Sequence, residues 1–169
     1  MVAALAFERL GLSVCCTDPK PPVSSRVERG ADLRTTAFLQ PSQKFLDELG
    51  LWHILKNHST PLEIMRIVDA GGSNNSNNIK LVRDFEAREI SDLPFGWNVP
   101  NWLSRQTLQK ALAASDKAEF LGNVATTRVF TRDAGARILL STGQTLTARL
   151  VVGADGRNSL VRQSAGISV

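Results

Sequence analysis

The sequence of 169 residues contains no tyrosine, only two cysteines and only two histidines. Because aromatic residues are few, an aromatic platform that stacks nucleic-acid bases is not expected. The cysteines, Cys15 and Cys16, are adjacent, so they form neither an ordinary structural disulfide nor a CxxC metal site, and they fit a reducing compartment. His53 and His58 stand five positions apart without a cluster of other ligands, and no metal site is predicted.

The sequence also lacks a long apolar run and a block of charges of one sign. Glu8 and Arg9 interrupt the N-terminal apolar stretch, and no uncharged run approaches the roughly 18 to 20 residues of a membrane-spanning helix. Lys and Arg outnumber Asp and Glu by 20 to 16, but acidic residues are interspersed throughout, which favours a solvated surface over a nucleic-acid patch. We expect a soluble, cytoplasmic protein that comprises one domain or a piece of one and binds no nucleic acid.

The N-terminal pattern is typical of the second half of a βαβ dinucleotide-binding unit. Residues 2–10 are strong helix formers with apolar side chains on most of the circumference, and Gly11 stands where a helix C-cap belongs. Residues 12–17 are a short uncharged run that predicts a strand buried on both faces of a parallel sheet, ended by Asp18 and Pro19. No GxGxxG motif occurs, so the first strand and the phosphate loop of such a unit are absent from the sequence.

The middle of the chain predicts alternating helices and strands. A helix is expected to begin at Ser42 and to end before Gly50, and another is expected over 104–112. The polar segment 71–78, which can bury nothing, is expected to be a mobile loop. Strands are expected over 62–69, 79–85 and 95–99.

The last third predicts a β-meander that leads into the most specific string of the sequence. The third strand is expected to run directly into the GADG sequence at 153–156, after which a helix opens near Ser159. Glycines let the backbone approach a ligand closely, while Asp155 either accepts hydrogen bonds from ribose hydroxyls or fixes an ordinary strand-to-helix turn. The three expected strands are 124–132, 136–141 and 145–152.

This string resembles the AspGly fingerprint of the flavoprotein aromatic hydroxylases, which are single-component FAD monooxygenases, with the approximate form GADGxxSxVR. Four more segments, in the same order as in the family, are similar to its ubiquinone-biosynthesis branch, the UbiH- and UbiF-type hydroxylases. The resemblance therefore covers nearly the whole chain. The four segments are DLRTTAF at 32–38, LGLW at 49–52, FGWNVPN at 95–101 and SRQTLQKAL at 104–112.

The resemblance implies that three residues lie near the pyrophosphate or along the cofactor. Arg34 matches the arginine near the pyrophosphate, where a guanidinium pairs with two phosphate oxygens, although a surface arginine is the ordinary reading of such a residue. Arg105 and Gln109 match helix residues that lie along the cofactor, and their spacing of four projects them from one helical face.

The resemblance implies three further binding residues, two at the adenosine of FAD and one at the pyrophosphate regions. Asp18 matches the acidic residue that binds the adenosine ribose, with a helix-breaking AspPro turn as the alternative. Val124 stands where a main chain meets the adenine, although a core valine would look the same. Asp155 matches the fingerprint aspartate, which the family associates with the pyrophosphate regions of both FAD and NAD(P)H.

The fold implied by the resemblance is α/β. It is an FAD-binding, Rossmann-like domain of the GR2 or PHBH-like type, here as a fragment with a β-meander and part of an interleaved substrate-domain sheet. A later GlyAsp fingerprint of the family is absent from the sequence. The expected parts are an FAD-binding part over 1–58, which lacks the first strand and GxGxxG, a partial substrate-domain sheet over 59–101, and an FAD-binding part over 102–169.

The function implied by the resemblance is that of an FAD-dependent monooxygenase with NAD(P)H as co-substrate, which hydroxylates a small aromatic substrate such as a phenolic ubiquinone precursor. The full-length protein would then associate peripherally with a membrane. We nominate no catalytic acid, base or nucleophile, because the cofactor performs the difficult step. Another FAD-dependent oxidoreductase of the same superfamily and a noncatalytic truncated remnant remain as alternatives. We expect the chain of 169 residues to bind FAD weakly or not at all.

Overall fold

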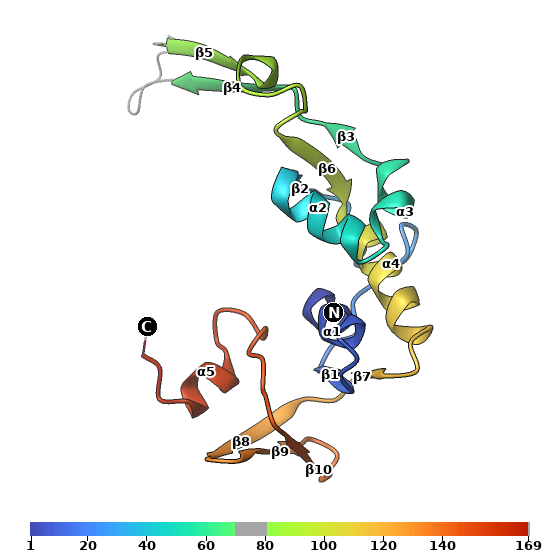
Figure 1. Ribbon diagram of the computed structural model, residues 1–169, viewed down its shortest axis with the longest axis vertical. Helices are drawn as coiled ribbons and strands as arrows, with labels where there is room; N and C mark the ends of the chain where they lie inside the picture. The colour runs from blue at the N-terminus through green and yellow to red at the C-terminus, as the bar shows by residue number, and fades with distance from the viewer. Residues whose placement is uncertain (70–80, 169) are drawn as a thin grey trace. The chain divides into compact units, whose positions relative to one another are not determined.

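The computed structural model describes residues 1–69 and 81–168 (Figure 1). The chain divides into two compact units, which we call the terminal unit, Met1–Pro22 with Leu112–Val169, and the central unit, Val23–Ala111. The loop expected over 71–78 and the first two residues of the strand expected over 79–85 lie outside the described residues. The expected division into FAD-binding and substrate-domain parts stays a prediction.

The terminal unit begins with the expected helix. α1 spans Val2–Arg9, and Ala4 and Leu5 are buried on it. Gly11 adopts a φ of +84°, and its amide donates to the Glu8 carbonyl at 2.7 Å. The next amide donates to the carbonyl of residue 7 at 3.2 Å, which completes the Schellman arrangement that favours glycine after a helix. The predicted stop signal at Gly11 is confirmed.

The expected parallel strand is also present. β1 (Val14–Asp18) pairs in parallel with β7 (Ala118–Gly122), a strand that the sequence patterns did not predict. The expectation that this strand is buried on both faces is wrong, because Cys15 is exposed. Burial on both faces requires a wide, covered sheet, and among the described residues β1 pairs with β7 alone.

The predicted β-meander is confirmed, with a shorter third strand. β8 (Thr126–Arg132), β9 (Gly135–Leu140) and β10 (Thr145–Ala148) pair in antiparallel order, drawn in orange to brown in Figure 1. The third strand does not continue to Val152, because its partner β9 begins at Gly135 and offers pairing only as far as Ala148. The buried cluster of the meander is Val129, Ala136, Ile138 and Leu140.

The last element of the terminal unit is α5 (Leu160–Ser164), which packs against β8. Its position agrees with the helix expected near Ser159, which is the N-cap residue. The segment that joins β10 to α5 contains the AspGly string and forms no strand or helix. A short helix therefore follows a turn and not a buried strand.

The central unit contains a small antiparallel sheet with β6 (Gly96–Pro100) in the middle. β2 (Thr35–Leu39) pairs along the whole of β6, and the short β3 (Thr60–Pro61) pairs on its other side. A β-carbon on Gly96 would lie 2.4 Å from the Phe38 carbonyl oxygen, so the close approach of β2 and β6 requires glycine there.

Three α-helices belong wholly or largely to the central unit: α2 (Gln40–Glu48), α3 (Trp52–Lys56) and α4 (Asn101–Ala113). The expectation that the first of these starts at a serine is wrong. It begins two residues earlier, with a proline in its first turn, a position that suits the fixed φ of that residue. α4 likewise begins at residue 101 and not at 104. Leu46, Leu55 and Val99 are buried, and Trp52 packs edge-on against Trp97 at 5.4 Å between ring centroids.

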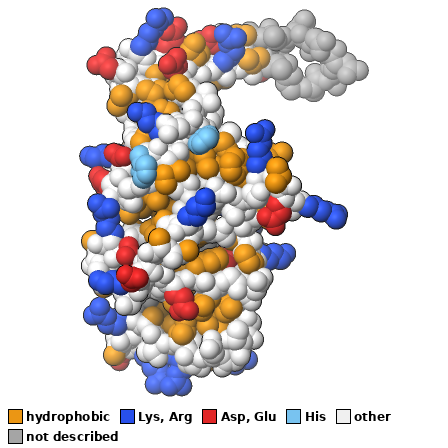
Figure 2. Space-filling view, turned by 90° about the vertical axis from the view of Figure 1, so that its right-hand side faces the viewer, with side chains coloured by type: hydrophobic (Ala, Val, Ile, Leu, Met, Phe, Trp, Pro, Cys, Tyr) orange, Lys and Arg blue, Asp and Glu red, His pale blue; other side chains and the backbone are white. Residues whose placement is uncertain are grey.

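Charged side chains of both signs are spread over the surface. On the face displayed in Figure 2, Lys and Arg alternate with Asp and Glu. No helix in the described ranges 1–69 and 81–168 is long and apolar enough to cross a membrane.

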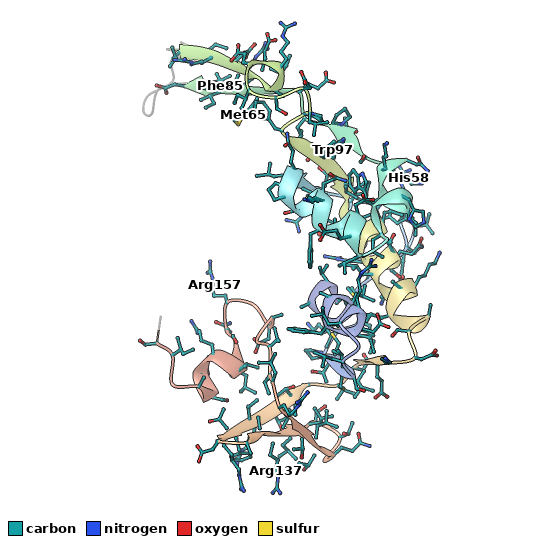
Figure 3. All side chains as sticks on the ribbon, in the orientation of Figure 1. His58, Met65, Phe85, Trp97, Arg137 and Arg157 are labelled. Atoms are coloured by element: carbon teal, nitrogen blue, oxygen red, sulfur yellow. The ribbon has the colours of Figure 1, made fainter. Side chains whose placement is uncertain are left out.

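The remaining pair of strands forms a solvent-exposed ribbon. β4 (Ile64–Asp69) and β5 (Leu81–Glu86) correspond to the strands expected over 62–69 and 79–85, and they pair antiparallel. Met65 lies opposite Phe85 in the register, and Figure 3 labels both on the two strands. Arg66 pairs with Asp84 on the other face of the ribbon through two hydrogen bonds of 2.7 Å.

Candidate functional site

A cluster of charged side chains in the central unit surrounds the carboxylate of Asp32. Arg34 binds this carboxylate side-on: Nε donates to Oδ1 and Nη2 donates to Oδ2, each at 2.9 Å. Arg105 on α4 donates from Nη2 to Oδ2 at 3.2 Å, and the Asn101 side-chain amide donates to the same oxygen at 3.0 Å. We call these four residues the Asp32 cluster. It joins two of the residues that the sequence nominated, Arg34 and Arg105.

Backbone contacts hold the two sides of this cluster in register. Arg34 directly precedes β2, and its carbonyl accepts a hydrogen bond from the Asn101 amide at 2.9 Å, where α4 begins. The Thr36 hydroxyl donates to the Asn101 side-chain oxygen at 2.6 Å. Because β2 is paired with β6, and β6 runs directly into α4, the sheet fixes where Arg34 and Arg105 lie relative to each other.

The electrostatics of the cluster keep Asp32 ionised. Hydrogen bonds from the Arg34 guanidinium, then from Asn101, hold the pKa of Asp32 far below its ordinary range, and they outweigh the opposing effect of burial. Asp32 in turn raises the pKa of Arg34. The side chain of Asp32 is only 11% exposed, whereas that of Arg34 is 84% exposed and that of Arg105 is 34% exposed. The cluster thus presents two guanidinium groups over one shielded carboxylate.

Sequence reasoning missed Asp32 and Asn101, although both lie within segments that carried the resemblance. An Asp-x-Arg spacing just before a strand was the available signal, since it allows a side-on pair within three residues. Gln109 lies four residues after Arg105 on α4, so the two share a face as expected. Gln106 donates to the Ser24 carbonyl at 3.2 Å and ties α4 to the segment before the cluster.

The structure brings Asp18 and Val124 together in the terminal unit. Asp18 ends β1, opposite Gly122 in the register of β7, and its carbonyl accepts the Val124 amide at 3.2 Å. The Asp18 carboxylate accepts the Lys20 amide at 2.8 Å, so it also closes the turn after the strand. Val124 is half-buried against the core of the meander. The carboxyl end of parallel strands is the usual ligand edge of an α/β sheet.

Asp155 has a different environment from the other nominated residues. Its Oδ2 accepts hydrogen bonds from the Leu160 amide at 2.7 Å and the Val161 amide at 3.3 Å. Amides in the first turn of a helix have no acceptor within the helix, so Asp155 supplies one. Burial raises its pKa, but the hydrogen bonds from Ser159 and these amides outweigh burial, and the net pKa is lowered. Of the two roles open to Asp155 from the sequence, the structure displays that of fixing the turn.

The glycines of the same string serve this turn too. A β-carbon on Gly153 would lie 3.0 Å from the Val161 β-carbon, so the backbone passes close to α5 only without a side chain. Gly156 has a φ of +79° in open space, and glycine is required there by conformation alone. Ser159 accepts the Arg162 amide at 3.0 Å as the N-cap.

The donor sets fit parts of an FAD molecule. Two guanidinium groups on one carboxylate suit a diphosphate, because arginine matches pairs of phosphate oxygens. A carboxylate at the end of a parallel strand suits ribose hydroxyls. The nominated residues fall into three groups: Arg34, Arg105 and Gln109 in the central unit, Asp18 with Val124 in the terminal unit, and Asp155 at the start of α5.

Comparison with known proteins gives sequence relatives over the whole chain. The chain is 36% identical over 166 residues to "Ubiquinone hydroxylase UbiL" of Rhodospirillum rubrum, covering 98% of this chain and 37% of the relative. It is 27% identical to "3-demethoxyubiquinol 3-hydroxylase" of Escherichia coli, covering 98% of this chain and 41% of that protein. The chain therefore spans about two fifths of the length of these curated relatives.

Solved structures show the same fold at low identity. A crystal structure of PqsL, described as a probable FAD-dependent monooxygenase from Pseudomonas aeruginosa, matches with a TM-score of 0.73 and 20% identity, over 99% of this chain and 43% of that one. The flavin-dependent monooxygenase PieE, in complex with FAD and substrate, also gives a TM-score of 0.73, at 18% identity, over 98% of this chain and 30% of that one.

The family model described as "FAD binding domain" matches residues 1–169. This match includes both the Asp32 cluster and the pair Asp18 and Val124. The chain therefore belongs to the FAD binding domain family.

Proposed function

We propose that this chain forms the FAD-binding part of an NAD(P)H-dependent monooxygenase that hydroxylates an aromatic ring, of the kind found in phenolic precursors of ubiquinone. The observation that carries the proposal is the pair of guanidinium groups, Arg34 and Arg105, held on Asp32 within a chain 36% identical to a ubiquinone hydroxylase. FAD would be the cofactor, and NADH or NADPH the co-substrate.

The residues of this chain would bind and orient the cofactor. Arg34 and Arg105 would pair with diphosphate oxygens, and Asp18 would accept hydrogen bonds from a ribose hydroxyl. The Val124 main chain would meet the adenine, and Gln109 would lie farther along the same face of α4 as Arg105. When bound, FAD supplies the electron transfer and the reaction with oxygen. Asp155 would hold the start of α5.

The overall reaction sets what must be measured. NAD(P)H gives two electrons and is oxidised to NAD(P)⁺, one atom of O₂ replaces a ring C–H bond with C–OH, and the other atom leaves as water with the remaining protons. Consumption of NAD(P)H alone is not sufficient, since reduced flavin also passes electrons to oxygen without hydroxylation. Incorporation of one ¹⁸O atom from ¹⁸O₂ into the ring product is therefore the decisive readout.

The test uses a chimera in which residues 1–169 replace the matching segment of the Rhodospirillum rubrum relative, of which they cover 37%. The chimera contains the parts of the relative that lie outside the match. We expect a yellow protein that oxidises NADH or NADPH and places one ¹⁸O atom in a prenylated phenol. The unaltered relative is the positive control, and the chimera carrying Arg34→Ala is the matched negative control.

A folded chimera that holds FAD and oxidises NAD(P)H without labelling any phenol would contradict the hydroxylase proposal and favour another FAD-dependent oxidoreductase. A folded chimera that holds no FAD would contradict cofactor binding by this chain and favour a noncatalytic remnant.

A further inference from the structure

We propose that Asp32 is a positioning residue, which orients Arg34 and Arg105 as one diphosphate-binding fork. This inference rests on the proposed function and adds to it, because the resemblance includes Asp32 in a matching segment but assigns it no role. Both guanidinium groups donate to the Asp32 carboxylate, of which solvent reaches little.

The geometry leaves the outer edge of Arg34 available. Arg34 uses Nε and Nη2 for Asp32, so the remaining N–H donors, on Nη1 and the far side of Nη2, point away from the carboxylate. The side chain is 84% exposed, and an exposed arginine without such a pair samples many rotamers. The side-on pair therefore selects one orientation before any ligand binds.

Because the Asp32 carboxylate is shielded, its oxygens bind the two guanidinium groups and Asn101 and are little available to solvent or to other cations. Its side chain is 11% exposed and accepts hydrogen bonds from Arg34, Asn101 and Arg105, with Oδ2 shared by all three. Asn101 is itself held by Thr36 at 2.6 Å. Two cations and one anion give the cluster a net charge of +1, which suits an anionic ligand.

An electrostatic role and a positioning role of Asp32 predict opposite changes in diphosphate affinity for the variant Asp32→Asn. This substitution removes one negative charge, so a purely electrostatic cluster would bind a diphosphate more tightly. It also weakens the side-on pair with Arg34, so a positioning residue predicts weaker binding. The direction of the change therefore separates the two roles without reference to enzyme turnover.

The test is an NMR titration of the chain with ADP, which has the adenosine and the diphosphate of FAD. The arginine Nε–H signals of Arg34 and Arg105 are followed, and AMP serves as the control ligand with one phosphate fewer. We expect ADP to shift both signals and AMP to shift them less. Asp32→Asn should weaken ADP binding by about tenfold, the usual scale for a charged hydrogen bond, and should bring the ADP and AMP affinities closer together. Asp32→Glu should restore part of the difference.

The control variant is Asp84→Asn, which removes the acceptor of an equivalent side-on pair in the β4–β5 ribbon. It should leave ADP binding unchanged, and the dispersion of the amide spectrum verifies folding for each variant. Tighter ADP binding in Asp32→Asn, or an equal loss with ADP and AMP, would overturn the positioning role. Absence of an ADP shift at Arg34 in the wild-type chain would overturn the inference as well, while hydroxylation by the chimera would still decide the proposed function.

Discussion

Two arginine–aspartate pairs with nearly the same geometry occur in different surroundings of this molecule. Arg34 meets Asp32 side-on with two hydrogen bonds of 2.9 Å, and Arg66 meets Asp84 side-on with two of 2.7 Å. The side chain of Asp32 is 11% exposed and binds a second guanidinium and an amide, whereas that of Asp84 is 35% exposed on a two-stranded ribbon. The two pairs therefore differ in their surroundings and not in their own geometry, and of the two carboxylates it is that of Asp32 that binds a second guanidinium.

The first prediction is expected to give the largest effect. Arg34→Ala should weaken ADP binding by about tenfold to a hundredfold, because a charged hydrogen bond to an anion contributes roughly 1.5–3 kcal/mol. Arg66→Ala is the matched control and should leave the ADP affinity unchanged. Isothermal titration calorimetry at fixed ionic strength measures both. Equal ADP affinities for the two variants would remove the distinction between the pairs.

The second prediction concerns Asp155, a third carboxylate whose partners are backbone amides. Asp155→Ala should lower the free energy of unfolding of the terminal unit by about 1 kcal/mol, the usual loss for a helix-start acceptor. It should leave ADP binding at the Asp32 cluster unchanged. Asp155→Asn keeps a side-chain acceptor and should lose less. Urea unfolding measures the stability, and an Asp155→Ala protein of wild-type stability with weakened ADP binding would reverse the assignment.

The third prediction follows from the lowered pKa of both aspartates in the arginine pairs. A carboxyl whose pKa is lower in the folded state stabilises the fold at pH values above its unfolded pKa, near 3.9, and that contribution disappears as the pH falls through the folded pKa. We expect no change between about pH 6 and 8 and a loss of stability in acid. Carbon-detected NMR of the carboxyl groups should show Asp32 titrating at lower pH than Asp84. The reverse order would contradict the tighter network around Asp32.

The fourth prediction is the smallest effect. Asp84→Asn should change the thermal unfolding midpoint by no more than the error of the measurement, because isolated exposed ion pairs contribute little. Asp32→Asn should lower the midpoint measurably, since it leaves two guanidinium groups and an amide without a charged acceptor. Differential scanning calorimetry compares the two. A larger fall in the midpoint for Asp84→Asn would show that the exposure of the carboxylate does not determine which pair stabilises the fold more.

Local patterns in the sequence predicted part of this fold. The helix over residues 2–10, its glycine stop at Gly11 and the parallel strand were readable because helix propensity and turn conformation are short-range properties. Strand β7 was missed, since its pairing with β1 depends on residues about a hundred positions apart. The run before Gly153 was misread as strand because β-branched residues favour strands only where a partner is present.

The candidate site, like the fold, could be predicted from the sequence only in part. Arg34 and Arg105 were nominated through the resemblance, yet nothing local indicated that one carboxylate joins them across 73 positions of sequence, from Asp32 to Arg105. Asn101 was missed for the same reason, because its role arises from the register of β2 with β6. The AspGly string was the most specific motif, and its hydrogen bonds are made within its own turn. The contact of Asp155 with the cofactor stays a prediction.

The central claim is that the diphosphate of FAD lies against Arg34 and Arg105, and ³¹P NMR of FAD bound to the chimera tests it most directly. The two diphosphate resonances report contact with guanidinium groups regardless of turnover. We predict that Arg34→Ala shifts these resonances or releases the FAD, while Arg66→Ala leaves them unchanged. Identical ³¹P spectra and equal FAD retention in the two variants would contradict the account.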